Sequence, residues 1–178
     1  MKIDAIILAA GKGKRMQSAS PKVLQQVAGK ALLQHVLDTS LQLKSCQPHI
    51  VVGDQASLVK ASVSAPKSSK WSKQAKQLGT GHAVKQSLKG LRAGSIALIL
   101  YGDVPLVKSS TMNNLVKAAG KSSLALLSFE QKTPKGYGRI IRSPRGKVLG
   151  IVEEKDATIE QKKITEVNSG IIAVASNK

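Results

Sequence analysis

The 178-residue sequence has few aromatic residues, few acids and a single cysteine. Aromatic residues make up 2% of the chain, so Leu, Val, Ile and Ala have to fill the core, which a hydrophobic content of 42% allows. Because Cys46 is the only cysteine, a disulfide within the chain is excluded, as is typical of cytoplasmic proteins. The longest apolar runs, residues 5–10 and 96–101, are too short to span a membrane, and the first residues do not resemble a secretory signal. We therefore expect a cytoplasmic protein with an aliphatic core and no contact with membranes.

Acidic residues are scarce: 10 Asp and Glu stand against 28 Lys and Arg, which gives a net charge of +18. Between Asp54 and Asp103 there is no acid at all, although lysines recur throughout that stretch. Such a surplus attracts polyanions without specifying which, so nucleic acid, nucleotides and phosphosugars are all candidate ligands. A solvated cationic surface explains the charge equally well. The shortage of aromatic rings argues against stacking on single-stranded bases, so we do not expect specific nucleic-acid binding.

Strand and helix patterns alternate through the first two thirds of the chain. Short apolar runs predict strands at residues 3–9, 49–52 and 95–101. Helical spacing of apolar residues predicts helices at residues 31–43, 56–63, 80–91 and 111–119, and the polar segment 65–77 predicts a loop. Strand-like runs at residues 124–129, 138–142, 147–152 and 170–175 dominate the last third. This order predicts an α/β fold with a mainly parallel mixed sheet flanked by helices.

Polar residues follow three of the predicted strands. They are residues 11–15, Gly53 with Asp54, and Gly102 with Asp103. In open α/β sheets, ligands bind beyond the carboxyl ends of the strands. The shared placement therefore predicts a ligand-binding cleft at that end of the sheet.

The stretch LAAGKGKRM, residues 8–16, is a glycine-rich turn with cations. It is not a P-loop, because Arg15 follows Gly13 and Lys14 where Ser or Thr is required, and it lacks the third glycine of the dinucleotide fingerprint. Gly11 and Gly13 let backbone N–H groups approach a phosphate, and Arg15 and Lys22 can neutralise it. A tight turn with solvated lysines would give the same pattern.

Asp103 in LYGDVPL follows an apolar strand and precedes a proline. A carboxylate at this point can ligate Mg²⁺, which binds oxygen and often combines one or two carboxylates with substrate phosphates. An aspartate that only caps a turn would give the same sequence pattern.

Two further polar groups are candidates for ligand binding. Gln74 and Gln77 precede a Gly-Thr-Gly turn, and their amides can pair with the edge of a nucleobase, although the same pattern often caps helices. The acids at residues 153–156 can bind sugar hydroxyls or a metal, or form a charged strand end. Asn168, at a strand entrance, is also typical of a turn.

Taken in order, six motifs resemble one family: LAAGKGKRMQSASPKVLQQVAGKALLQHVLD, QLGTGHAV, YGDVPL, GYGRIIR, GIVEEKDAT and EVNSGI. The sequence resembles the uridyltransferase (pyrophosphorylase) domain of the bacterial bifunctional N-acetylglucosamine-1-phosphate uridyltransferase/glucosamine-1-phosphate acetyltransferase over residues 7–175. The resemblance implies a Rossmann-like nucleotidyltransferase fold. It also implies Mg²⁺-dependent transfer of UMP from UTP to N-acetylglucosamine 1-phosphate, giving UDP-N-acetylglucosamine for cell-wall biogenesis and pyrophosphate.

Matching of the motifs assigns roles to individual residues. Arg15 and Lys22 would be the catalytic cations on the triphosphate and the sugar phosphate, and Asp103 would hold Mg²⁺. The nucleotide and the sugar would be bound by Leu8, Ala10, Gly11, Gly13, Lys22, Gln74, Gln77, Gly79, Thr80, Tyr101, Gly138, Glu153 and Asn168.

The sequence departs from the family pattern in three respects. Lys14 stands where the family usually has Thr, the chain stops at Lys178 before a segment that carries a second metal ligand, and no acetyltransferase β-helix domain follows. We therefore expect a single nucleotidyltransferase domain over residues 1–178, incomplete at its C-terminus and monomeric. The alternatives are a fragment that binds nucleotide sugar without turnover, and a related sugar-phosphate nucleotidyltransferase that uses another nucleoside triphosphate.

Overall fold

The computed structural model describes residues 1–11, 20–122 and 124–176, and the chain divides into two compact units. Unit 1 comprises Met1–Ala125 and Ile172–Lys178, and unit 2 comprises Leu126–Ile171. Strand β10 (Glu166–Ala175) contributes residues to both units. No helix in the described part of the chain has the length and hydropathy that a membrane crossing needs.

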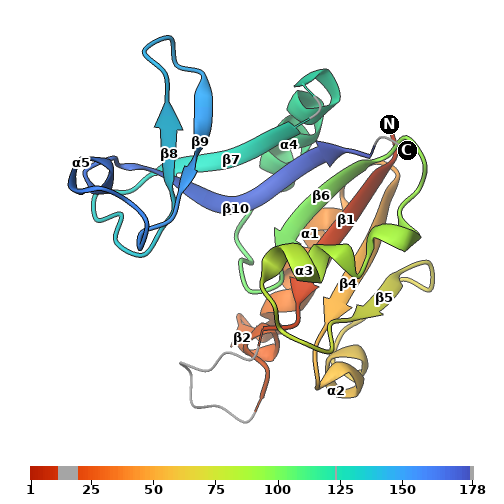
Figure 1. The fold of residues 1–178 in the computed structure, drawn as a ribbon. Helices are drawn as coiled ribbons and strands as arrows, with labels where there is room; N and C mark the ends of the chain where they lie inside the picture. Colours follow the sequence, from red (N-terminus) through yellow and green to blue (C-terminus); the bar gives the residue numbers. More distant parts are fainter. Residues whose placement is uncertain (12–19, 123, 177–178) are drawn as a thin grey trace. The chain divides into compact units, whose positions relative to one another are not determined.

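Unit 1 is built on a mostly parallel sheet with the strand order β5-β4-β1-β6-β10 (Figure 1). Its parallel strands are β1 (Ile3–Ala9), β4 (Cys46–Val52), β5 (Lys70–Lys73) and β6 (Ile96–Tyr101). The last residues of β10 pair with β6 in the antiparallel direction. The predicted α/β class with a mainly parallel mixed sheet is confirmed.

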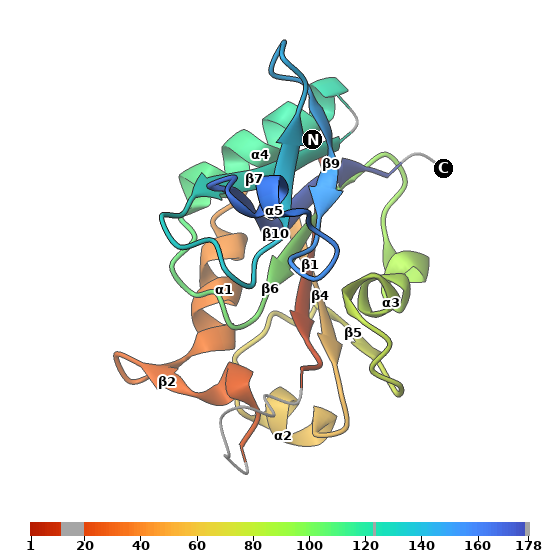
Figure 2. The same ribbon diagram turned by 60° about the vertical axis from the view of Figure 1, so that its left-hand side comes forward.

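Helices cover both faces of this sheet. Helices α1 (Leu32–Leu41) and α4 (Ser109–Ser122) lie on one side, and α3 (Thr80–Lys85) lies on the other (Figure 2). The shorter elements of unit 1 are η2 (Lys22–Leu24), β2 (Gln26–Val27), β3 (Lys30–Ala31), α2 (Ala56–Ala61) and η3 (Leu88–Gly90).

The central strand β1 is buried along its whole length. Ile6 and Leu8 pack in one cluster with Val51 of β4 and Ala83 of α3, while the intervening Ile7 points to the opposite face. Burial on both faces explains why this strand reads as a continuous apolar run rather than as an alternating pattern. Aliphatic side chains form most of this cluster, as the composition predicts.

Unit 2 contains β7 (Leu124–Glu130, of which Leu126 onward belongs to the unit), β8 (Arg139–Arg142), β9 (Val148–Val152), α5 (Ile159–Lys162) and the first part of β10. Strands β8 and β9 form an antiparallel hairpin, and Arg139 pairs with Val167 of β10. Helix α5 begins with a capping box in which the Thr158 hydroxyl accepts the N–H of Gln161.

Several sequence predictions differ from the structure. The strands predicted at residues 49–52 and 170–175 begin earlier, at Cys46 and Glu166, so Asn168 lies within β10. The segment 65–77, predicted as a loop, contains β5, a short polar strand that pairs with β4. Its Trp71 ring lies half-buried beneath the ammonium group of Lys60, 5.4 Å from the ring centroid, so this edge strand has little of the apolar signature of a buried one. The helix predicted at residues 80–91 ends at Lys85, and the Ser87 hydroxyl donates to the carbonyl of Val84 just before η3.

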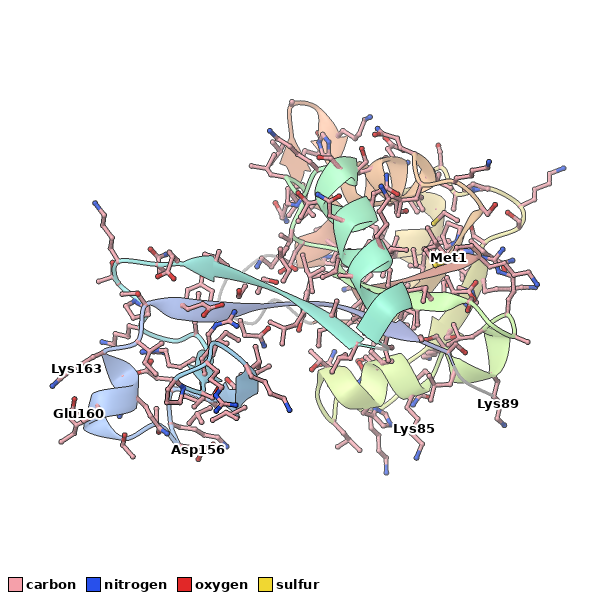
Figure 3. All side chains as sticks on the ribbon, turned by 90° about the horizontal axis from the view of Figure 1, so that it is seen from above. Met1, Lys85, Lys89, Asp156, Glu160 and Lys163 are labelled. Atoms are coloured by element: carbon pink, nitrogen blue, oxygen red, sulfur yellow. The ribbon has the colours of Figure 1, made fainter. Side chains whose placement is uncertain are left out.

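The lysines of the acid-free stretch are solvent-exposed. They include Lys70 and Lys73 of β5 and Lys85 and Lys89, which project from α3 and η3 in Figure 3. In unit 2, by contrast, Lys163 pairs with Glu160 at 2.8 Å. Much of the positive charge of unit 1 is therefore solvated and not consumed by internal ion pairs.

A buried polar cluster lies at the start of β1, at the opposite end from the strand's carboxyl terminus. Asp4 and His49, whose side chains are 0% and 1% exposed, are joined at 3.1 Å, and Arg92 Nε donates to Asp4 Oδ1 at 2.9 Å. Burial lowers the pKa of His49 despite the neighbouring carboxylate. Burial would raise the pKa of Asp4, but hydrogen bonds from groups such as Arg92 and His49 hold it below its ordinary value.

We predict that stability falls as the pH drops below about 6.5, the ordinary pKa of histidine. The unfolded chain binds a proton at His49 at a higher pH than the folded chain does, so the stabilisation is complete above that pH and is lost as the pH falls. The loss per pH unit reaches about 1.4 kcal/mol for one such group. Urea unfolding at pH 7.5 and pH 5 measures it.

His49→Gln removes the titrating ring and should flatten this pH dependence. His35→Gln is the matched control, because His35 lies partly buried on α1 and contacts the carbonyl of Val27. It should retain the decline of the unmodified protein. An equally steep decline in His49→Gln would contradict the prediction.

Candidate functional site

The carboxyl ends of the parallel strands of unit 1 meet at one edge of the sheet. In the strand register, Ala9 of β1 lies beside Val52 of β4, and Leu8 lies beside Tyr101 of β6. The chain therefore leaves the three strands side by side, at Gly11, at Gly53 and at Gly102. The structure thus brings together Gly11, Gly53 with Asp54, and Gly102 with Asp103, while residues 12–15 of the first polar group lie outside the described part of the chain.

At two positions of this edge, Gly53 and Gly102, the neighbouring backbone leaves little room for a side chain. A Cβ on Gly53 would lie 2.8 Å from the carbonyl oxygen of Ala10, and a Cβ on Gly102 would lie 3.1 Å from that of Leu8. The N–H of Gly102 donates to the same Leu8 carbonyl at 2.9 Å. The backbones after β1, β4 and β6 therefore approach each other more closely than side chains would allow.

A pocket of about 290 Å³ opens beside these backbones. Its lining includes Ala10, Gly11, Pro21, Gly53 and Gln77. The Gln77 side chain crosses to β1 and donates from Nε2 to the carbonyl of Ala10 at 2.6 Å. Small residues such as Ala10, Gly11 and Gly53 therefore form part of the lining, where a phosphate can approach the backbone closely.

Lys22 and Asp103 form an ion pair at the same edge. Lys22 belongs to η2, Asp103 follows β6, and Lys22 Nζ lies 2.6 Å from Asp103 Oδ2. Both side chains remain accessible, at 44% and 26% exposure. The pair combines a cation for phosphate with a carboxylate for a metal ion, and its partial exposure keeps the cost of separating the two groups low.

Gln74 is buried and tied to the turn that precedes α3. Its Nε2 donates to the carbonyl of Gly79 at 3.1 Å and lies 3.0 Å from His82 Nδ1. Gly79 has φ +95°, a conformation that favours glycine, and Thr80 begins the helix. Gln74 therefore fixes the Gly79–Thr80 turn through the Gly79 carbonyl. The Gln77 side chain is the more exposed of the two amides.

In unit 2, Gly138, Glu153 and Asn168 lie together although they come from three strand ends. The N–H of Asn168 donates to the carbonyl of Gly138 at 2.8 Å. A Cβ on Gly138 would lie 2.9 Å from Ile151 Cγ2 and 3.2 Å from Glu153 Oε1, so the carboxylate packs close to the Gly138 backbone. Asn168 Oδ1 accepts the N–H of Gly170 at 2.9 Å.

The remaining predicted site residues have the following positions. Leu8 is buried, and its carbonyl accepts the N–H of Gly102. Tyr101 packs against the apolar cluster that contains Ile6 and Ala83, on the α3 face of the sheet. Gly13, Lys14 and Arg15 lie outside the described residues.

The described acids place limits on how a metal ion can be held. Within residues 1–11, 20–122 and 124–176, no group of three or more His, Cys, Asp or Glu side chains is arranged to bind a metal. An ion at Asp103 would need further oxygens from water or from a bound phosphate, which is the way Mg²⁺ binds in many nucleotide sites. The donor chemistry of Asp103 fits such an ion.

Sequence reasoning missed the role of Arg139 and left that of Glu154 open. Arg139 Nη2 donates to Glu154 Oε2 at 2.8 Å, so this carboxylate is engaged in an ion pair. In the sequence, Arg139 and Arg142 flank the same Ile-Ile pair, and no local pattern indicates that the first is buried and the second exposed.

A family model described as MobA-like NTP transferase domain matches residues 5–152. The chain belongs to this family. It is a nucleotidyltransferase, and the Rossmann-like fold expected from the motifs is confirmed.

Among curated relatives, the Bifunctional protein GlmU of Nitrosomonas eutropha is 51% identical over 98% of this chain. That of Dechloromonas aromatica is 50% identical over 97%. The chain spans 38% of the length of each relative.

Solved nucleotidyltransferases share the fold at low identity. A UDP-glucose pyrophosphorylase complexed with UDP-glucose has a TM-score of 0.80 at 16% identity, with 98% of this chain and 76% of that chain covered. A CMP:2-keto-3-deoxy-manno-octonic acid synthetase complexed with CTP has a TM-score of 0.70 at 18% identity, with 98% and 74% covered.

We predict that Gly53→Ala destabilises this NTP transferase by about 1–3 kcal/mol, because the new methyl group would overlap the backbone of Ala10. Thermal unfolding measures the change. Gly81→Ala is the control, since a Cβ there meets nothing within 4 Å, and it should be neutral or slightly stabilising. Equal stability of the two variants would show that the strand ends can separate at little cost.

Proposed function

We propose that the chain catalyses Mg²⁺-dependent transfer of UMP from UTP to N-acetylglucosamine 1-phosphate, giving UDP-N-acetylglucosamine and pyrophosphate. The observation that carries the proposal is the Lys22–Asp103 pair beside the glycine-lined end of β1, in a chain about 50% identical to bifunctional GlmU proteins. The choice of UTP and N-acetylglucosamine 1-phosphate rests on the six motifs that resemble the uridyltransferase domain.

The reaction requires mainly that the two substrates are aligned and that the charge of their phosphates is neutralised. A phosphate oxygen of the sugar phosphate attacks the α-phosphorus of UTP in line, and pyrophosphate leaves with the bond electrons. No covalent protein intermediate is needed. The N–H groups around Ala10 and Gly11 approach the phosphates, Lys22 neutralises their charge, and Gln77 holds the strand end in place through the Ala10 carbonyl.

The remaining groups bind the two ends of the substrates. Gln77, Gly79 and Thr80 would contact the uridine, while the buried Gln74 would act by holding the Gly79–Thr80 turn in place. Gly138, Glu153 and Asn168 would hold the sugar. Asp103 would hold a magnesium ion, which would supply positive charge to neutralise the phosphate oxygens during the transfer. Release of Asp103 from Lys22 leaves the ammonium free for a phosphate.

A coupled assay for pyrophosphate release from UTP and N-acetylglucosamine 1-phosphate tests the proposal. Replacing UTP with dTTP or CTP, and the acetylated sugar with glucose 1-phosphate, should lower kcat/KM. Binding of UDP-N-acetylglucosamine without product would favour the fragment that binds but does not turn over. Absence of both binding and product would contradict the proposed function.

We expect Asp103→Asn to lower kcat by about 10²-fold or more, the loss that follows removal of one electrostatic contact to a transition state. Asp38→Asn is the matched control: Asp38 pairs with Lys30 at 2.8 Å on the surface of the same unit. Its rate should stay within about twofold of the unmodified protein. Equal effects of the two substitutions would remove Asp103 from the reaction.

Lys22→Met should tighten the binding of Mn²⁺, used in place of Mg²⁺ and without nucleotide, because the ammonium no longer neutralises Asp103. An exposed ion pair contributes up to about 1 kcal/mol, so we expect a gain of up to about fivefold. Electron paramagnetic resonance of free Mn²⁺ measures it. Lys30→Met breaks the Lys30–Asp38 pair and should leave the affinity unchanged. Weaker Mn²⁺ binding in Lys22→Met would contradict a competition between the Lys22 ammonium group and the metal ion for Asp103.

A further inference from the structure

Arg139 is a buried cation at the start of β8. Its side chain is 2% exposed, although a guanidinium group stays protonated in proteins. A buried charge of this kind is costly unless hydrogen bonds and an opposite charge compensate for it.

Contacts with three segments of unit 2 compensate for the charge of the guanidinium group. Nη1 donates to the carbonyl of Tyr137, and Nη2 donates to Glu154 Oε2 at 2.8 Å and to the carbonyl of Lys162 at 3.4 Å. Glu154 Oε2 also accepts the N–H of Gly136 at 3.0 Å. The turn before β8, the turn after β9 and the end of α5 are therefore attached to one side chain.

Each residue of the proposed sugar site is next in sequence to Arg139, to its ion-pair partner Glu154 or to its strand partner Val167. Gly138 precedes Arg139, Glu153 precedes Glu154, and Asn168 follows Val167, the β10 partner of Arg139. The Gly138 carbonyl accepts the N–H of Asn168, and Glu153 Oε1 lies 3.2 Å from the position that a Cβ on Gly138 would take. A shift of either turn would change the distances among all three residues.

We propose that Arg139, acting through Glu154, is the positioning residue that holds Gly138 and Glu153 in place for the sugar phosphate. This inference rests on the proposed function of those two residues. A planar fork of donors is needed to reach a carboxylate and two carbonyl oxygens, so lysine cannot replace arginine here. Arg139 Nε is buried and has no hydrogen-bond partner among the described residues, which makes the residue a poor choice for stability alone.

The chain supplies a matched control on the same strand. Arg142 also makes an ion pair within unit 2, with Nε 2.6 Å from Glu166 Oε2 and Nη2 2.6 Å from Oε1, but its side chain is 42% exposed. Hydrogen bonds from Arg142 lower the pKa of Glu166 to about 2. Arg142→Met thus removes a strong pair on β8 without touching either turn.

The kinetic test compares Arg139→Met, Glu154→Gln and Arg142→Met in the full chain. Arg139→Met should raise the KM for N-acetylglucosamine 1-phosphate about tenfold or more and leave the KM for UTP within about twofold. Glu154→Gln should act in the same direction with a smaller effect, and it carries the test if Arg139→Met fails to fold. Arg142→Met should change neither KM. An unchanged sugar-phosphate KM, or an equal rise in both KM values, would overturn the proposal.

Hydrogen exchange separates this inference from the proposed function. In Arg139→Met and in Glu154→Gln, peptides covering residues 134–138 and 152–156 should exchange faster than in Arg142→Met. Unchanged exchange in both peptides overturns the positioning role, whatever the kinetics. If the unmodified protein neither binds UDP-N-acetylglucosamine nor releases pyrophosphate, the proposed function fails. Faster exchange in the variants would then support only the part in which Arg139 orders the two turns.

Discussion

The carboxyl end of β1 lies between two other backbones at a separation that excludes side chains. On one side the Ala10 carbonyl faces Gly53, and on the other the Leu8 carbonyl faces Gly102. Because β1 is hydrogen-bonded to β4 and β6 along its length, it cannot move away from either neighbour without breaking the ladder. The chain therefore leaves the sheet at a fixed point near Gly11, and small residues of these strand ends line the pocket beside it.

Two carboxylates of unit 1 illustrate how burial separates structural from functional ion pairs. Asp4 is fully buried with Arg92 and His49, so removal of one partner would leave an uncompensated charge inside the protein. Asp103 is partly exposed and its bond to Lys22 contributes little to stability, so an incoming metal ion or phosphate can separate the two. Both aspartates are paired with a cation, but the pair of Asp4 is buried at the start of β1 and the pair of Asp103 is accessible at the carboxyl ends of the strands.

Much of the fold could be predicted from the sequence, because a buried parallel strand such as β1 is a short apolar run and parallel strands end at one edge. Strand β5 could not be predicted, since it is polar and is stabilised by pairing with β4 and by the Lys60–Trp71 contact. The convergence of Gly138, Glu153 and Asn168 was implied only by the family resemblance, and their roles remain predictions.

Contacts across long stretches of sequence were the least predictable part of the site. Nothing local in the sequence indicates that Gln77 reaches Ala10 or that Lys22 meets Asp103. Likewise, the two arginines of β8 have similar neighbours in sequence, and their different burial is decided by which elements pack against them. The predicted roles of Gly13 and Arg15 fall outside the described residues and stay untested.

Trp71 is the only tryptophan of the chain, and its place on β5 gives the protein a natural fluorophore close to the proposed nucleotide site. Its strand leads directly to Gln74, and the cation above its ring comes from α2. Emission from an indole is sensitive to a neighbouring charge, so movement of Lys60 or of β5 would alter the indole emission, which comes from Trp71 alone and can be excited separately from the two tyrosines. Ligand titrations at this edge of the sheet can accordingly be followed by intrinsic fluorescence, without a label that would disturb the lysine-rich surface.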